Sequence, residues 1–143
     1  MTEHEEPDEA RALIQMSRSA DYKIRADAAR RLAHFAVDAA AADRLRQLIL
    51  DADDTMVTFV ATTALIARGD AAGLAIVASA LAVADENQLD WIDTGVGDGL
   101  NRSESARQHA MRICSDLATR HPDESVRRGA SLLHPLLGRA GLA

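Results

Sequence analysis

Aromatic residues are scarce in this chain of 143 residues: they make up 3% of it, as two Phe, one Tyr and one Trp. Sheets depend on aromatic and β-branched side chains, so this scarcity disfavours a β-sandwich or a barrel. Hydrophobic residues nevertheless reach 48%, and Ala alone occurs 29 times. Alanine is the best helix former and has the smallest side chain with a Cβ. The composition therefore predicts an all-α protein of closely packed helices.

Cysteine, lysine and long apolar runs are also nearly missing. Cys114 is the one cysteine, which excludes an intramolecular disulfide and favours a reducing compartment. No window approaches the roughly 18 apolar residues of a membrane span, and the acidic N-terminus does not resemble a signal peptide. The formal net charge of −6 disfavours nonspecific binding of nucleic acid. We expect a single cytoplasmic domain over residues 1–143.

A repeated pattern, Asp-x-x-apolar followed by small residues and a Leu, runs along the chain. It begins at Asp21, at Asp54 and at Asp123, with Ile24, Val57 and Val126 as the first apolar residues. Trp91 fills the gap between the second and third copies, which gives spacings of 33, 34 and 35 residues. A period of this length is typical of stacked helical repeats. The alignment predicts that Trp91 occupies a core position.

Segments of helical periodicity lie between these copies, so each repeat is expected to be a hairpin of two helices. The predicted hairpins are roughly 9–36, 40–67, 71–100 and 104–137, with frayed ends at 1–7 and 139–143. Gly69, Asp70 and Ser103 stand where caps are needed. Three glycines at 95, 97 and 99 weaken a helix. We therefore expect this helix to end, or to become mobile, after about Val96.

The pattern resembles the HEAT repeat, as found in small bacterial HEAT-like proteins. The residues that carry the resemblance are Asp21, Ile24, Arg25, Ala28, Ala29, Asp54, Val57, Ala61, Asp123, Val126, Arg127 and Ala130. The resemblance implies a right-handed α-solenoid of about four helical hairpins. It also implies a concave face, lined by the second helix of each hairpin, that binds another macromolecule.

Catalytic and metal-binding patterns are not evident in the sequence. The run Asp51–Asp54 lacks the Gly and Glu of a calcium loop and fits helix capping in a solvated turn. His109 and Cys114 are five residues apart, which places them on diverging faces of a helix. We interpret Cys114 as a small core residue. The expectation is a non-enzyme without a catalytic residue, cofactor or metal.

Repeat geometry assigns the concave face to positions one, two, five, six and nine after each core apolar residue. Apolar side chains would then occupy the middle of a groove and arginines its two ends, as in a protein interface. The predicted partner-binding residues are Phe59, Thr62, Ile66, Ile92, Asp93, Val96, Arg25, Arg30, Arg127 and Arg128. The alternative is that this register is wrong by one residue and that the apolar members belong to the core.

The sequence thus favours a non-catalytic protein-protein interaction module, a scaffold that binds a partner segment in its groove. One alternative is an immunity or antitoxin protein that neutralises a basic toxin. Another is a HEAT-like DNA-binding protein of the glycosylase type, which the net charge disfavours. An acidic row of Glu86, Asp90 and Asp93 suggests a basic partner, or simply a solvated helix face. Apolar leucines near the C-terminus (132, 133, 136 and 137) suggest a homodimer through that end.

Overall fold

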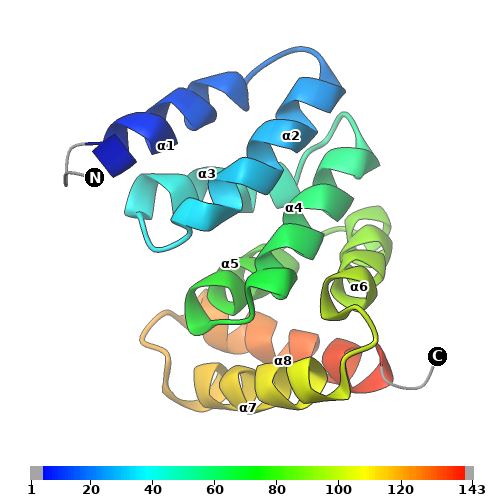
Figure 1. Ribbon diagram of the computed structural model, residues 1–143. Coiled ribbons are helices and arrows are strands. Elements are labelled where there is room, and N and C mark those ends of the chain that lie inside the picture. Colours follow the sequence, from blue (N-terminus) through cyan, green and yellow to red (C-terminus); the bar gives the residue numbers. More distant parts are fainter. Residues whose placement is uncertain (1–4, 141–143) are drawn as a thin grey trace.

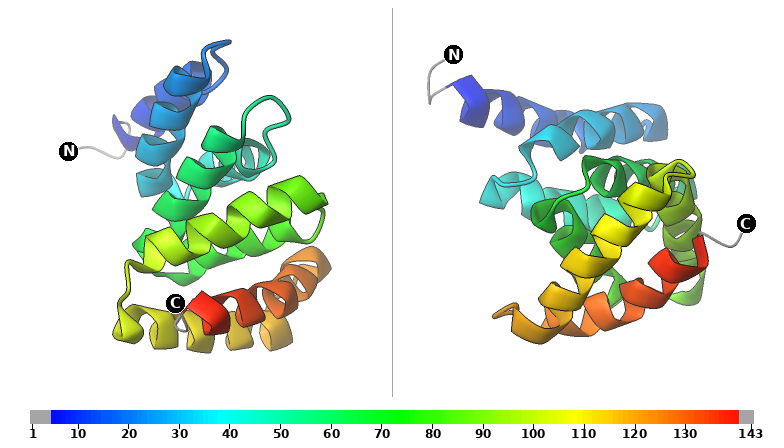
Figure 2. Two further views of the ribbon diagram at one scale, coloured as in Figure 1. Left: turned by 90° about the vertical axis from the view of Figure 1, so that its right-hand side faces the viewer. Right: turned by 60° about the horizontal axis from the view of Figure 1, so that its bottom comes forward.

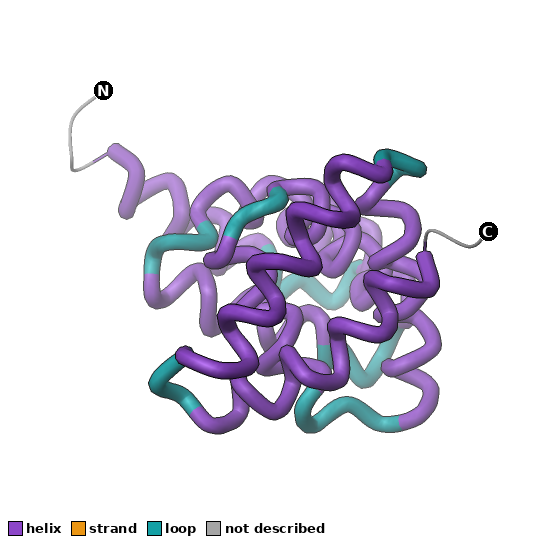
Figure 3. The backbone as a smooth tube through the Cα atoms, turned by 90° about the horizontal axis from the view of Figure 1, so that it is seen from below, coloured by secondary structure: helices purple, strands orange, loops and turns teal. Residues whose placement is uncertain are grey.

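The computed structural model describes residues 5–140 and contains helices and no strand within that range (Figure 1; Figure 3). The α-helices are α1 (Glu5–Met16), α2 (Tyr22–Leu32), α3 (Ala39–Ile49), α4 (Thr55–Arg68), α5 (Ala71–Leu81), α6 (Glu86–Leu100), α7 (Glu104–Arg120) and α8 (Glu124–Ala140). A short 3₁₀ helix, η1 (Ala33–Phe35), extends α2. The all-α prediction is confirmed. None of the described helices combines the length and the apolar character needed to cross a membrane.

Polar caps determine where most helices begin. Asp54 accepts a hydrogen bond from the backbone N–H of Met56, and Asp70 accepts one from that of Gly73. Ser103 caps α7 in the same way, and Asp85 forms a reciprocal capping box with Gln88 at the start of α6. Gly69 ends α4 in the left-handed conformation, with φ at 72°. The caps predicted at residues 69, 70 and 103 are confirmed.

The helices lie in two rows. Successive odd-numbered helices contact one another from α1 to α7, and successive even-numbered helices do so from α2 to α8. In Figure 2 (left), α2, α4, α6 and α8 follow one another down one side of the molecule. Each of the four predicted hairpin ranges contains two of these helices. However, α5 and α6 approach each other less closely than α6 approaches α4 or α5 approaches α8.

Alanine and aliphatic side chains fill the space between the rows. Large aliphatic residues such as Leu45 and Leu65 are fully buried, and so are many alanines. The fully buried alanines are Ala28, Ala29, Ala41, Ala61, Ala78, Ala80 and Ala130. Small side chains let helix axes approach closely, which is how a core with few aromatic residues keeps a dense packing.

Glycines make the closest helix contacts. A Cβ added to Gly129 in α8 would lie 1.7 Å from the carbonyl oxygen of Ala78 in α5. Gly95 and Gly99 of α6 face Thr62 and Ile66 of α4, and added Cβ atoms would lie 2.8 Å and 2.7 Å from their Cβ atoms. The expectation that this helix ends after about Val96 is therefore wrong. It continues to Leu100 because two of its glycines are packing positions.

The chain ends differ from the predicted fraying where the structure describes them. Residues 5–7 belong to α1, and residues 139 and 140 belong to α8. The remainder of the two segments expected to fray, 1–4 and 141–143, lies outside the described residues.

Candidate functional site

The register predicted for α6 is wrong by one residue. Ile92 has no exposed surface, whereas the side chain of Trp91 is 36% exposed. The core position that the repeat alignment gave to Trp91 therefore belongs to its neighbour. The cause is the placement of Gly95 and Gly99 against α4, because it fixes the rotation of α6 about its own axis. The same alignment is also wrong in α2, where Ile24, given as a core residue, is 40% exposed.

Four of the residues predicted to line a groove are core residues. Thr62, Ile92 and Val96 have no exposed surface, and Ile66 is 3% exposed. The positions assigned to an open face lie instead at the contact between α4 and α6, the pair of helices with the most extensive contact. The apolar groove centre expected from the sequence is therefore not present in this form. The alternative stated for this register, that its apolar members are core, is confirmed for Ile66, Ile92 and Val96.

The predicted arginines have mostly internal partners. Arg25 is 7% exposed, and its Nε donates to Asp51 Oδ2 at 3.0 Å while its Nη1 donates to the carbonyls of Ser19 and Ala20. Asp51 in turn accepts hydrogen bonds from the backbone N–H groups of Asp53 and Asp54. The pair thus ties the link before α2 to the link before α4. Arg25 was expected on an open face, and its burial contradicts that expectation.

Of the other three predicted arginines, two also have partners within the chain. Arg127 donates to the carbonyls of His121 and Pro122, so it closes the link before α8. Arg30 forms an exposed ion pair with Asp27 on its own helix. Arg128 is exposed and has no ion pair among the described residues. Three of the four arginines are therefore already engaged within the chain.

Phe59, which is half-buried, and the exposed Trp91 form an aromatic pair where α4 meets α6. Their ring centroids are 6.3 Å apart and their planes are inclined by 78°, which is an edge-to-face contact. Met56, one turn before Phe59 on α4, is 44% exposed. Phe59, Trp91 and Met56 together form what we call the aromatic patch. Of these three residues, only Phe59 is among the partner-binding residues predicted from the sequence. Trp91 was predicted to be a core residue, and Met56 was assigned no role.

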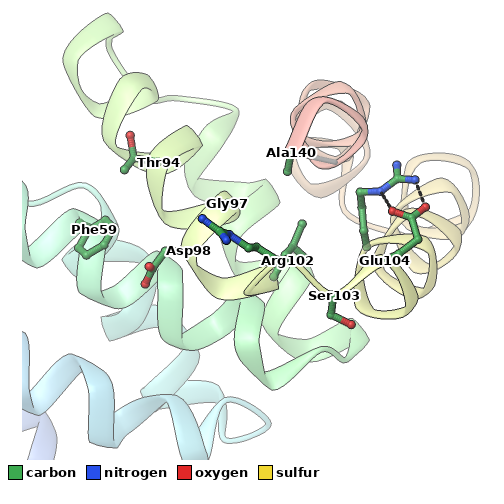
Figure 4. Close-up of a pocket in the computed structure, with 10 residues that line it drawn as sticks. Phe59, Thr94, Gly97, Asp98, Arg102, Ser103, Glu104 and Ala140 are labelled. Carbon is green, nitrogen blue, oxygen red and sulfur yellow. Dashed lines mark hydrogen bonds and ion pairs between the residues drawn. The ribbon is translucent and has the colours of Figure 1, made fainter. Parts of the chain in front are cut away.

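A cavity of about 620 Å³ opens beside the aromatic patch (Figure 4). Phe59 lines it from α4, and Gly97 and Asp98 line it from α6. The link between α6 and α7, the start of α7 and Ala140 of α8 complete its wall. In this link Arg102 adopts the left-handed conformation, with φ at 61°, which is strained for a residue with a long side chain. Arg102 is a further residue of this wall that the sequence did not assign to a site, whereas Gly97 occupies one of the positions that repeat geometry assigned to the concave face.

Carboxylates dominate the exposed side of α6. Glu86, Asp90, Asp93 and Asp98 are all exposed. Of these, Asp93 forms an ion pair with Arg139 of α8, with an N–O distance of 3.9 Å. At the cavity wall, Glu104 is paired with Arg107, whose hydrogen bond lowers the pKa of this carboxyl. Glu86, Asp90 and Asp98 form no ion pair with any described residue, and the nearby Arg102 forms none either. Three unpaired carboxylates against one unpaired arginine leave an excess of negative charge along this side of α6.

Cys114, the one cysteine of the chain, is buried. Burial raises the pKa of the Cys114 thiol to about 12, and its Sγ donates to the carbonyl of Ala130 at 3.1 Å. A thiol in this state is a poor nucleophile at neutral pH. Among the described residues, no group of three or more His, Cys, Asp or Glu is placed to hold a metal ion. The candidate site thus consists of the aromatic patch, the cavity and the row of carboxylates.

The C-terminal leucines do not form the apolar end expected from the sequence. Leu133, Leu136 and Leu137 are buried where α8 packs between α5 and α7, and only Leu132 is exposed. Of these four leucines, only Leu132 could therefore contribute to a homodimer interface at that end.

Comparison of this chain with protein-family models, with curated proteins and with solved structures gives no match in any of the three. Its function has to be inferred from the geometry of its own surface.

Proposed function

We propose that this protein is a non-catalytic protein-protein interaction module that binds its partner at the aromatic patch. The observation that carries the proposal is the exposed Trp91, which makes an edge-to-face contact with the half-buried Phe59. Exposed Trp side chains are enriched at the centres of protein interfaces, where they bury a large area at a small entropic cost. This chain has few aromatic residues, and two of them are in contact here, one of them exposed.

The fold supports this proposal if the helices are four HEAT-like repeats of an α-solenoid, as we further propose. The two rows of helices and the Asp-x-x-apolar starts of α2, α4 and α8 fit such repeats. In a solenoid, each repeat contacts its neighbours and leaves a long side open to a partner. The row of α2, α4, α6 and α8 would be that side (Figure 2), and the aromatic patch lies on its two middle helices, α4 and α6. A cytoplasmic location fits a lone buried cysteine.

The alternative of an immunity or antitoxin protein is a special case of the same proposal, because a basic toxin would be the partner. The row of carboxylates on α6 favours it over a neutral partner. A DNA-binding protein of the glycosylase type has less support. Arg25 and Arg127 hold links within the chain, and Arg30 is paired with Asp27.

The experiment is a capture from host lysate with matched variants as bait, read by mass spectrometry. Trp91→Ala removes the exposed ring, and we expect it to lose the partner that the wild-type protein retains. Val37→Ser is the control, because Val37 is 78% exposed in the link between η1 and α3 and does not belong to the aromatic patch. Equal capture by wild type and Trp91→Ala would overturn the proposal. Far-UV circular dichroism establishes that each bait keeps its helices.

A further inference from the structure

Gly97 is a glycine that the packing of the fold does not require. A Cβ added there would meet no atom within 4 Å, whereas at Gly95 and Gly99 it would meet atoms of α4 below 3 Å. Glycine inside a helix destabilises that helix relative to alanine, so its use at an uncrowded position has no packing benefit. Gly97 lines the cavity beside the aromatic patch, close to Asp98 (Figure 4). The missing side chain therefore leaves the backbone of α6 accessible from the cavity.

The charged residues in and beside this cavity indicate which kind of chemical group it would bind. Glu86, Asp90 and Asp98 are exposed and have no ion pair with any described residue. Of these, only Asp98 lines the cavity, together with Arg102, which is likewise unpaired among residues 5–140, and with the ion pair of Glu104 and Arg107. The excess of negative charge lies beside the cavity along α6, at Glu86 and Asp90, and the cavity wall offers an unpaired carboxylate, Asp98, and an aromatic ring, Phe59. A cation with a flat, weakly hydrated head fits this combination better than an anion or a neutral apolar group.

We infer that the partner at the aromatic patch is a basic protein segment, and that one of its arginine side chains enters the cavity over Gly97. This inference rests on the proposed function and adds the chemistry of the partner. The guanidinium would pair with Asp98 and stack on Phe59, while further basic residues of the segment lie along Glu86 and Asp90. Arginine suits this position because its planar head can pair with a carboxylate and stack on an aromatic ring at once.

Two other occupants fit the surface less well. A second copy of this chain would bring the same row of carboxylates and a net charge of −6, so like charges would face each other. A nucleic acid would bring phosphates to a surface with an excess of negative charge. Both are outcomes that the experiment can detect.

The test begins with a phage-displayed library of random 16-residue peptides, selected on the wild-type protein and counter-selected on Trp91→Ala. We expect the Trp91-dependent sequences to be rich in Arg and Lys. The best of them is then synthesised and titrated into the protein. Trp91 is the only tryptophan, so its fluorescence reports binding at the aromatic patch directly. A second synthetic peptide with Glu in place of every Arg and Lys is the matched control.

Substitutions in the cavity distinguish the inferred contact from general attraction. We expect Asp98→Asn to weaken binding by about fivefold or more, and Gly97→Ala to weaken it by a similar factor through loss of space. Asp116→Asn is the control, since Asp116 is an exposed carboxylate on α7 outside the cavity, and it should leave the affinity within about twofold. Arg102→Ala should strengthen binding, because it removes a like charge. Raising the salt concentration should weaken the wild-type complex.

The possible results separate the two proposals. Basic peptides that depend on Trp91 and on Asp98 would establish the inference. Trp91-dependent peptides that are neutral or acidic would overturn it and leave the proposed function standing. Unchanged affinity in both Asp98→Asn and Gly97→Ala would also overturn the entry of an arginine into the cavity. If no selected peptide depends on Trp91, or if the surface binds duplex DNA instead, both proposals fail. Binding of a second copy at the aromatic patch would overturn the inference alone.

Discussion

The two halves of this molecule are held together by different chemistry. In the N-terminal half, buried polar groups join the helix links: Arg25 pairs with Asp51, and Arg44 donates to the hydroxyl and the carbonyl of Ser17. In the C-terminal half, helices touch backbone to backbone at glycines, as at Gly129 against Ala78. The first kind of joint depends on charge and hydrogen bonds, whereas the second depends on the absence of a side chain.

This difference bears on where a binding site can form. The polar joints of the N-terminal half use the arginines that could otherwise meet a partner. The glycine joints of the C-terminal half fix the rotation of α6, and this rotation places Trp91 outside and Ile92 inside. The candidate site therefore lies where packing, rather than pairing, determines which side chains are exposed.

Gly129→Ala should have the largest effect on stability. Its Cβ would lie 1.7 Å from the carbonyl oxygen of Ala78, and neither atom belongs to a flexible side chain. The helices α5 and α8 would have to separate, so we expect a loss of about 4 kcal/mol in the free energy of unfolding, or failure to fold. Urea denaturation followed by circular dichroism measures it. Gly138→Ala is the control, because its Cβ would meet only Met111 Cε at 3.6 Å. Equal midpoints for the two variants would contradict the close crossing.

Arg25→Met tests the polar joint in the other half. It leaves Asp51 buried without its charged partner, which should cost about 3 kcal/mol. Arg30→Met is matched to it: the residue lies on the same helix and also has an aspartate partner, but its side chain is 59% exposed against 9% for Arg25. We expect a loss below about 1 kcal/mol for this exposed pair. If both variants lost the same free energy, burial would not be what makes the first joint strong.

Much of the architecture could be predicted from the sequence, because it depends on local signals. The repeat spacing and the caps at Asp54, Asp70 and Ser103 placed the helices within a few residues of their observed positions. The exposed face of α6 could not be predicted in this way. Aligning Trp91 with Val57 assumed that every repeat has the same register, but the glycines of α6 allow it to sit closer to α4 and rotated.

The burial of Arg25 against Asp51 could not be predicted from the sequence either. Its partner, Asp51, is 26 residues away and belongs to the next link. Both residues carry charge, and sequence reasoning assigns such residues to the surface unless a pair is known. The contact between Phe59 and Trp91 could not be predicted either, because it exists only once α4 and α6 are packed.

Gly99→Ala should weaken the joint between α4 and α6 by a smaller amount than Gly129→Ala weakens its own. The added Cβ would meet the Cβ of Ile66 at 2.7 Å and the carbonyl oxygen of Thr63 at 2.8 Å. We expect a loss of about 2 kcal/mol in the free energy of unfolding. Since the shift would displace α6, the emission of Trp91 should change in the folded state as well. A stable variant with unaltered emission would show that this joint is looser than the distances indicate.

Thr62→Val should stabilise the protein. The hydroxyl of Thr62 is fully buried between α4 and α6 and has no hydrogen-bond partner in the structure. Valine has nearly the same shape and no polar atom to desolvate, so we expect a gain of about 1 kcal/mol. The denaturation midpoint should rise without a change in the slope of the transition. A fall in stability would mean that the hydroxyl has a partner after all.

Gly97→Ala should have the smallest effect and the opposite sign to Gly99→Ala, although the two glycines are only two residues apart. Because no atom lies within 4 Å of the added Cβ, the substitution should raise helix propensity and stabilise the protein by about 0.5 to 1 kcal/mol. Chemical denaturation of both variants, side by side, measures the difference in sign. If Gly97→Ala destabilised the fold, this glycine would belong to the packing joints. If it stabilises the fold and weakens partner binding, Gly97 is retained for the partner, and α6 carries structural and binding glycines on its two sides.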